Sequence, residues 1–203
     1  MGRLFLVRHG QTAPNAAGLI QGQTDPELTA QGRQQAAALA PALPVETATA
    51  VISSPLRRAR QTAEALGGGR TFTIDPRWIE IAYGEFEGGD IADVRPTLWA
   101  NWEADPTWAP PGGGESLAAV AERVASACDE LAAATAAGDV IVVTHVNPIK
   151  LAVTWALGTP PQASGRMFVQ LASITTIEVS PAGHPVLLGF SALPAPGTGG
   201  TEG

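Results

Sequence analysis

Residues 4–15 read LFLVRHGQTAPN, an apolar run that stops abruptly at Arg8, His9 and Gly10. Four apolar residues followed by polar and turn-forming ones are typical of a buried β-strand that ends at Arg8. Open α/β sheets bind their ligands at the carboxyl edge of their parallel strands. A cation and an imidazole at that edge therefore point to a ligand site, and the stretch predicts both a central strand and the position of the chemistry.

Strand-like and helix-like patterns alternate along the rest of the chain, which is typical of a layered α/β domain. Apolar runs predict further strands at residues 50–53, 71–74, 139–144, 166–171, 173–179 and 185–190, the last two pairing antiparallel. Helical patterns cover residues 29–40, 55–66, 91–103, 115–137 and 148–157. We expect a three-layer α/β/α sandwich around a mostly parallel sheet, forming one domain over residues 1–193 with a flexible tail at residues 194–203.

One segment interrupts this alternation. Residues 83–114, here called the lid segment, are rich in Gly, Pro and Trp and contain a single helical pattern. A long excursion of this kind from a sheet is typical of a lid or a pocket wall. Its three tryptophans, Trp99, Trp102 and Trp108, fit either the core or the wall of a pocket for an apolar or aromatic group.

The composition disfavours some classes of binding partner. Its formal net charge of −7 disfavours nucleic acid or an anionic membrane as the main partner. No long uninterrupted apolar stretch is present and the first strand begins near residue 4, so we expect no membrane span or signal peptide and a cytoplasmic location. The single cysteine, Cys128, is interpreted as a core residue. Apolar edge strands suit a homodimer, but an ordinary monomer surface would look similar, and the oligomeric state stays open.

Ionisable residues follow several of the predicted strands. The first strand ends at Arg8 and His9, and the strand over residues 139–144 is followed by His145. Because the carboxyl ends of parallel strands share one edge, we expect two histidines to converge with arginines from the helix after residues 50–53. The arginines at the start of that helix are Arg57, Arg58 and Arg60, and the pattern alone does not choose among them.

Histidines and arginines in this combination indicate a pocket that handles phosphoryl groups. A guanidinium group offers a planar fork of donors that suits phosphate oxygens, and an imidazole is a nucleophile and acid–base group near neutral pH. A metal site would need more carboxylate or thiolate ligands near the histidines, and the arginines would repel the ion. We therefore expect no metal and no other cofactor.

Six segments occur together in a characteristic order. They are VRHGQT at residues 7–12 with Asn15, LTAQG at 28–32, SSPLRRARQTA at 53–63, residues 80–88, residues 111–116, and VVTH at 142–145. In these segments the chain resembles the histidine phosphatase superfamily, the phosphoglycerate-mutase-like phosphatases, over about residues 3–190. The residues after His145 are similar to a bacterial subgroup that includes α-ribazole phosphatase-like domains. The resemblance implies hydrolysis of a phosphomonoester through a phosphohistidine intermediate, without a metal.

The resemblance also implies a role for each matching residue. His9 would be the nucleophile, and Arg8, Arg58 and His145 would bind the phosphoryl oxygens. Glu80 would protonate the leaving oxygen and then activate the attacking water. The residues expected to contact the substrate are Asn15, Gln21, Gly22 and Val146.

Two departures from the pattern of the family bear on function. Ala82 stands where many relatives have an acidic residue, and Val146 stands where many have glycine. In the lid, Arg95 is the only cation of residues 88–114, which gives little support to a surface that binds the carboxylate of phosphoglycerate. We therefore predict a phosphatase acting on a small phosphorylated metabolite. A phosphoglycerate mutase and a non-catalytic phosphate-binding regulator are the alternatives.

Overall fold

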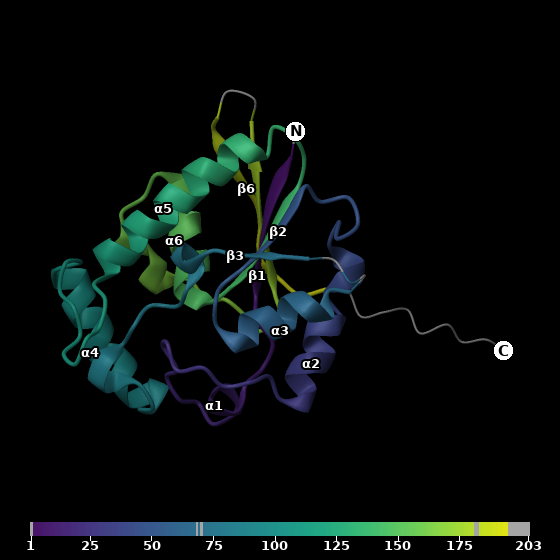
Figure 1. The fold of residues 1–203 in the computed structure, drawn as a ribbon. Coiled ribbons are helices and arrows are strands. Elements are labelled where there is room, and N and C mark those ends of the chain that lie inside the picture. Colours follow the sequence, from purple (N-terminus) through teal and green to yellow (C-terminus); the bar gives the residue numbers. More distant parts are fainter. Residues whose placement is uncertain (1, 68, 70, 181–182, 195–203) are drawn as a thin grey trace.

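A six-stranded sheet forms the centre of the protein. The computed structural model describes residues 2–67, 69, 71–180 and 183–194. The strands follow the order β3-β2-β4-β1-β5-β6 (Figure 1). Strands β1 to β4 are parallel, whereas β5 pairs antiparallel with both β1 and β6, so the predicted α/β class with a mostly parallel sheet is confirmed. The strands are β1 (Arg3–Arg8), β2 (Ala50–Ser53), β3 (Thr73–Ile74), β4 (Val140–Thr144), β5 (Ile174–Val179) and β6 (Pro185–Ala192).

Helices cover both faces of this sheet. The helices are α1 (Ala13–Ala16), α2 (Ala30–Ala37), α3 (Arg57–Ala65), α4 (Ile91–Ala104), α5 (Leu117–Ala134) and α6 (Val146–Leu157). Short 3-10 helices are η1 (Ala40–Ala42), η2 (Pro76–Trp78), η3 (Gly84–Phe86) and η4 (Pro161–Arg166). Helices α2 and α3 lie on one face, and α5 and α6 lie on the other (Figure 1). None of the helices in the described ranges is long and apolar enough to cross a membrane.

The alternation of side chains in β1 explains the three layers. Leu4 and Leu6 point into the core that α5 and α6 complete, and Phe5 and Val7 point into the core on the α3 side. Successive side chains of a strand point to opposite faces, so a strand that is apolar at every position must be covered twice. The predicted sandwich is confirmed.

Helix α6 begins at the carboxyl edge of the sheet. Strand β4 passes through His145 directly into α6, so the N-terminus of this helix lies at the carboxyl edge of the central strands. The helix ends at Gly158, which adopts the left-handed conformation that glycine favours. Its first N–H groups have no acceptor within the helix and are free to bind a group at the sheet edge.

The prediction of a strand over residues 166–171 is wrong. Helix η4 ends at Arg166, and residues 167–170 belong to no strand. The Val169 carbonyl accepts a hydrogen bond from Arg8 at 2.6 Å, and the Gln170 N–H donates to Ser191 Oγ at 2.8 Å. Side chains therefore form hydrogen bonds with backbone groups that would pair with a neighbouring strand if this segment belonged to the sheet. Most of the predicted tail, residues 195–203, lies outside the described residues.

Candidate active site

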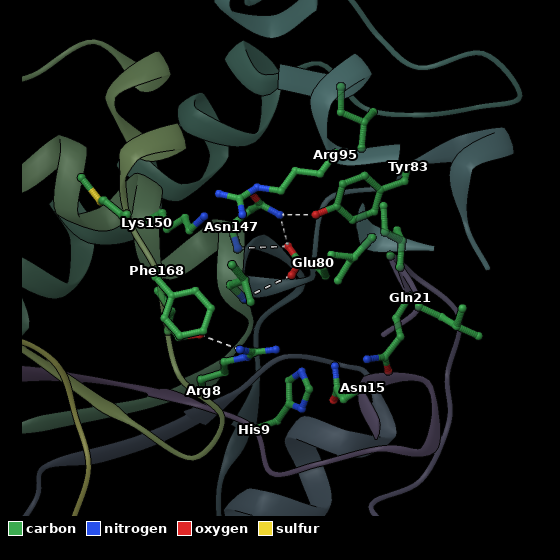
Figure 2. A pocket seen from close by; sticks show the side chains of 18 of the residues that line it. Arg8, His9, Asn15, Gln21, Glu80, Tyr83, Arg95, Asn147, Lys150 and Phe168 are labelled. Carbon is green, nitrogen blue, oxygen red and sulfur yellow. Dashed lines mark hydrogen bonds between the residues drawn. The ribbon is translucent and has the colours of Figure 1, made fainter. Parts of the chain in front are cut away.

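A cavity of about 200 Å³ opens at the carboxyl edge of the sheet (Figure 2). Side chains from β1, α3, α4 and α6 line it, together with loops between them. His145 lies behind His9, with their ring centroids 5.1 Å apart. The structure thus brings together every residue that the sequence analysis selected. Those that line the cavity are Arg8, His9, Asn15, Gln21, Gly22, Arg58, Glu80 and Val146.

His9 presents one ring nitrogen toward the cavity. Its Nδ1 lies 2.7 Å from the Gly10 carbonyl oxygen, which can only accept, so Nδ1 carries the proton and Nε2 carries the lone pair. Arg58 Nε donates to this Nε2 at 3.2 Å. Burial, followed by the positive charges of Arg58 and Arg8, lowers the pKa of His9 well below 6.5. His9 is therefore neutral at neutral pH, with a nucleophilic nitrogen beside a guanidinium group.

Two arginines, Arg58 buried and Arg8 half-buried, supply positive charge around that nitrogen. Arg58 donates through Nη1 to the Thr24 carbonyl at 2.6 Å and through Nη2 to the Gly22 carbonyl at 2.8 Å. Arg8 donates to the Val169 carbonyl, and its buried Nε has no hydrogen-bond partner within the described part of the chain. Burial lowers the pKa of Arg8 to about 10, which still leaves it charged at neutral pH. Both charges are bound by neutral carbonyls and stay available to an anion.

His145 is a second buried, neutral imidazole. Its Nε2 lies 2.7 Å from Ser54 Oγ, and its Nδ1 has no hydrogen-bond partner among the described residues. Burial is the main cause of a pKa well below 6.5, and the charge of Arg58 is the next. A buried polar atom without a partner is rare in folded proteins.

Both histidines are expected to protonate only below pH 6.5. A charged imidazolium would have to share a desolvated site with Arg8 and Arg58. The measurement is an NMR titration of the ring protons, which the low number of three histidines makes simple to assign with a His9→Ala variant. A titration midpoint of His9 at or above 6.5 would contradict this. The unfolded chain binds these protons more tightly, so stability should fall as the pH drops below 6.5.

The carboxylate of Glu80 lies at the N-terminus of α6 (Figure 2). Its Oε1 accepts hydrogen bonds from the backbone of Ile81 at 2.9 Å and from the backbone and side-chain nitrogens of Asn147 at 3.2 and 3.1 Å. Its Oε2 accepts from the Val146 N–H at 3.1 Å. The N–H of Val146, a residue expected to contact the substrate, is therefore bonded to Glu80. These bonds fix the carboxylate in the cavity wall.

An ion pair holds the segment that carries Glu80. It joins Arg123 on α5 to Glu115, which lies just before that helix. Arg123 donates through Nη1 to the Arg77 carbonyl at 2.6 Å and pairs through Nη2 with Glu115 at 3.1 Å. Glu115 in turn accepts from the Ala82 N–H at 3.0 Å. The chain is thus held on both sides of Glu80. Sequence reasoning missed this role of Arg123 and Glu115, because nothing in their local pattern links them to residues 77–82.

Asn15 and Gln21 direct amide groups into the cavity. The Thr12 hydroxyl lies 2.9 Å from Asn15 Oδ1 and 2.8 Å from Gln21 Oε1, and the Thr12 N–H donates to the same Asn15 oxygen. Because both amide oxygens face Thr12, the amide nitrogens point toward the cavity (Figure 2). Nitrogen donors at this position suit the oxygens of a phosphate group.

Gly22 is expected to be intolerant of a side chain. Its φ is +51°, and an added Cβ would overlap the carboxylate of Glu87, which the Tyr83 N–H holds in place. Gly22→Ala should lower the free energy of unfolding by about 2–3 kcal/mol and displace the carbonyl that binds Arg58. Gly18→Ala is the matched control, because Gly18 has a φ of +73° but open space around it, and should cost about 1 kcal/mol. Equal losses in urea denaturation would contradict this account.

The outer wall of the cavity combines aromatic rings with two cations. Trp99 packs edge-on against Trp102 at 5.5 Å between ring centroids, and both line the cavity, while Trp102 is also fully buried in the core. Of the three tryptophans of the lid segment, Trp99 and Trp102 therefore line the cavity, and Trp108 packs against the core. Arg95 extends from α4, and Lys150 from α6. Sequence reasoning missed Lys150, although its spacing from Val146 and Asn147 places the three on one face of a helix.

Comparison with known proteins places the chain in a family. The model of the histidine phosphatase superfamily (branch 1) matches residues 4–190. The chain belongs to the histidine phosphatase superfamily. As predicted from its motifs, this histidine phosphatase is a phosphoric monoester hydrolase, in the class of its relatives that are named phosphatases.

Several relatives carry names that specify a substrate. The histidine phosphatase is 36% identical to a glucosyl-3-phosphoglycerate phosphatase of Mycolicibacterium vanbaalenii, with 88% of each chain covered. It is 32% identical to a probable phosphoglycerate mutase of Yersinia enterocolitica, covering 87% of this chain and 84% of that one. A solved phosphoserine phosphatase variant from Entamoeba histolytica, in complex with phosphoserine, superposes with a TM-score of 0.84 at 29% identity, covering 95% and 98% of the chains.

Proposed function

We propose that this enzyme hydrolyses small phosphomonoesters through a phosphohistidine on Nε2 of His9, without a metal ion. The observation that carries the proposal is the unprotonated Nε2 of His9, held by the bond from Nδ1 to Gly10 and placed against Arg58. The described residues contain no cluster of three or more His, Cys, Asp or Glu side chains suited to a metal ion. In the proposed reaction the arginines supply the positive charge that phosphoryl transfer requires.

The reaction proceeds in two steps. First, Nε2 of His9 attacks phosphorus, the bond from phosphorus to the ester oxygen breaks, and the leaving oxygen takes a proton from Glu80. Second, the Glu80 carboxylate takes a proton from water, whose oxygen attacks phosphorus while the N–P bond breaks and phosphate leaves. Arg8 and Arg58 stabilise the charge on the equatorial oxygens in both steps. The Gly10 carbonyl stabilises the positive charge that the imidazole ring gains on phosphorylation.

A compact metabolite fits this cavity best. Its volume of about 200 Å³ is below the range of ~300–1,000 Å³ that is typical of cavities for drug-sized ligands. The relatives named for glucosyl-3-phosphoglycerate and phosphoserine support a substrate of the phosphorylated-acid type. The relative named as a probable mutase supports a second candidate, transfer of the phosphoryl group back to phosphoglycerate, which an assay for 2-phosphoglycerate formed from 3-phosphoglycerate tests. Cytoplasmic location and dimerisation stay predictions.

Hydrolysis of para-nitrophenyl phosphate in excess EDTA tests the proposed chemistry. We expect the rate to be unchanged by the chelator, because the phosphoryl charge is neutralised by arginines and not by a metal ion. Mixing with labelled substrate and quenching in alkali should trap an acid-labile phosphoprotein, with the label on His9. Loss of activity in EDTA that a divalent cation restores would refute the metal-independent mechanism.

A further inference from the structure

Lys150 is a buried cation that the proposed mechanism does not use. It is the sole lysine of the sequence, is 6% exposed, and lines the cavity with its Nζ 5.7 Å from the centroid of the Trp99 ring. Within the described ranges it forms no ion pair. Burial, and then the charge of Arg95, lowers its pKa to about 8, so it is mostly protonated at neutral pH. A buried ammonium group without a counter-ion is costly, and this one faces a ligand cavity.

A second cation reaches the same region from the opposite side. Arg95 projects from α4 across the cavity, and Figure 2 shows its guanidinium group directed toward Lys150 and Asn147. Two like charges that approach each other across a cavity repel, unless an anion lies between them. We propose that Lys150 and Arg95 form a second anion subsite, which binds the carboxylate of a phosphorylated hydroxy acid or amino acid. The inference rests on the proposed phosphatase function and names its substrate class.

The dimensions of the site favour a carboxylate within the same small molecule. The subsite and the phosphoryl site around His9 share one cavity of about 200 Å³, so a single compact ligand spans both. A guanidinium fork binds two carboxylate oxygens side by side, and an ammonium group adds a third donor. Apolar side chains such as Leu98, Trp99 and Phe168 also line this cavity and suit the short carbon chain of such a ligand.

The subsite also revises an expectation from the sequence. The sequence gives little support for carboxylate binding, because Arg95 is the only cation of residues 88–114. The second cation comes from α6, because the helix that begins after His145 turns Lys150 into the same cavity as Glu80. The binding site for the carboxylate is thus shared between the lid segment and the sheet edge.

Two esters that differ at one group test the subsite. D-3-phosphoglycerate and glycerol phosphate share a phosphorylated three-carbon chain, but only the first carries a carboxylate. We expect kcat/KM to be at least about tenfold higher for phosphoglycerate than for glycerol phosphate. Lys150→Met should lower the ratio of these two kcat/KM values by about 10–100-fold, which is the usual effect of losing a hydrogen bond to a charged group. Lys150→Arg should recover most of the ratio. Arg60→Met, which removes one exposed charge on α3, is the control and should leave the ratio unchanged.

Measurements of ligand binding test the subsite independently of catalysis. Calorimetric titration of the His9→Ala variant with each ester gives the same ratio from dissociation constants, whether or not the wild-type protein turns the esters over. A ratio that falls in His9→Ala/Lys150→Met and recovers in His9→Ala/Lys150→Arg supports the subsite. Equal affinity for the two esters, or a ratio that Lys150→Met leaves intact, overturns it. Turnover of para-nitrophenyl phosphate reports separately on the proposed phosphatase function.

Discussion

Replacement of His9 by alanine is expected to lower kcat for para-nitrophenyl phosphate by a factor on the order of 10⁴ or more. The variant loses the unprotonated ring nitrogen that lies beside Arg58. No other nucleophile in the described part of the cavity wall has the same support. The ring centroid of His145 lies 5.1 Å from that of His9, but Nε2 of His145 forms a hydrogen bond with Ser54 Oγ. The residual rate should therefore be that of hydrolysis without a phosphohistidine, with Arg8, Arg58 and Glu80 still in place.

The matched control for this variant is His184→Ala. His184 is exposed and lies directly before β6, so its loss should leave kcat within about twofold of wild type. Thermal unfolding of both variants checks that the fold is intact. His9→Ala should also fail to give the acid-labile phosphoprotein. Retention of more than about one tenth of the activity by His9→Ala would show that another group is the nucleophile.

The Glu80→Gln variant is expected to lose about 10²–10⁴-fold in kcat for an alkyl phosphate. An amide can neither protonate the leaving oxygen nor take a proton from water. Its NH₂ group would also face the N–H of Val146 or the donors of Asn147, which the carboxylate accepts at 3.1–3.2 Å. Both steps of the proposed reaction therefore slow down.

Two substrates separate the steps in which Glu80 acts. Para-nitrophenolate leaves without help from an acid, so phosphorylation of His9 should stay fast and only hydrolysis of the phosphohistidine should slow. A rapid burst of nitrophenolate followed by a slow steady state is the expected record in a stopped-flow experiment. Glu85→Gln, which alters an exposed carboxylate on η3, should behave like wild type. Equal losses for the alkyl and aryl esters without a burst would argue against proton transfer by Glu80.

The fold was predictable from the sequence where burial alone sets the pattern. Strands β1 and β4 are continuous apolar runs because helices cover both of their faces. The same rule fails at residues 166–171, where Met167, Phe168 and Val169 are apolar because they line the cavity. A wall for a ligand and a strand have the same local composition, and only the tertiary structure separates them.

The candidate site was predictable at the strand ends. His9 and His145 follow neighbouring parallel strands, and the pairing of β1 with β4 brings their rings together. The partners of Glu80 were not predictable, because they depend on how the chain after η2 meets the first turn of α6. Asn147 shows this, since it binds both Glu80 and the Tyr83 hydroxyl, from an otherwise ordinary helical position.

Helix α6 carries two kinds of function on one rigid element. Its first N–H groups hold Glu80, and one turn later Lys150 enters the outer part of the same cavity. A change of substrate made by repacking α6 would therefore also shift the group that moves the proton. Helix α4 reaches the cavity at its outer wall, through Arg95, Leu98, Trp99 and Trp102. Selectivity should be easiest to redesign, and to vary between related enzymes, on α4, where reaction rate and substrate choice are uncoupled.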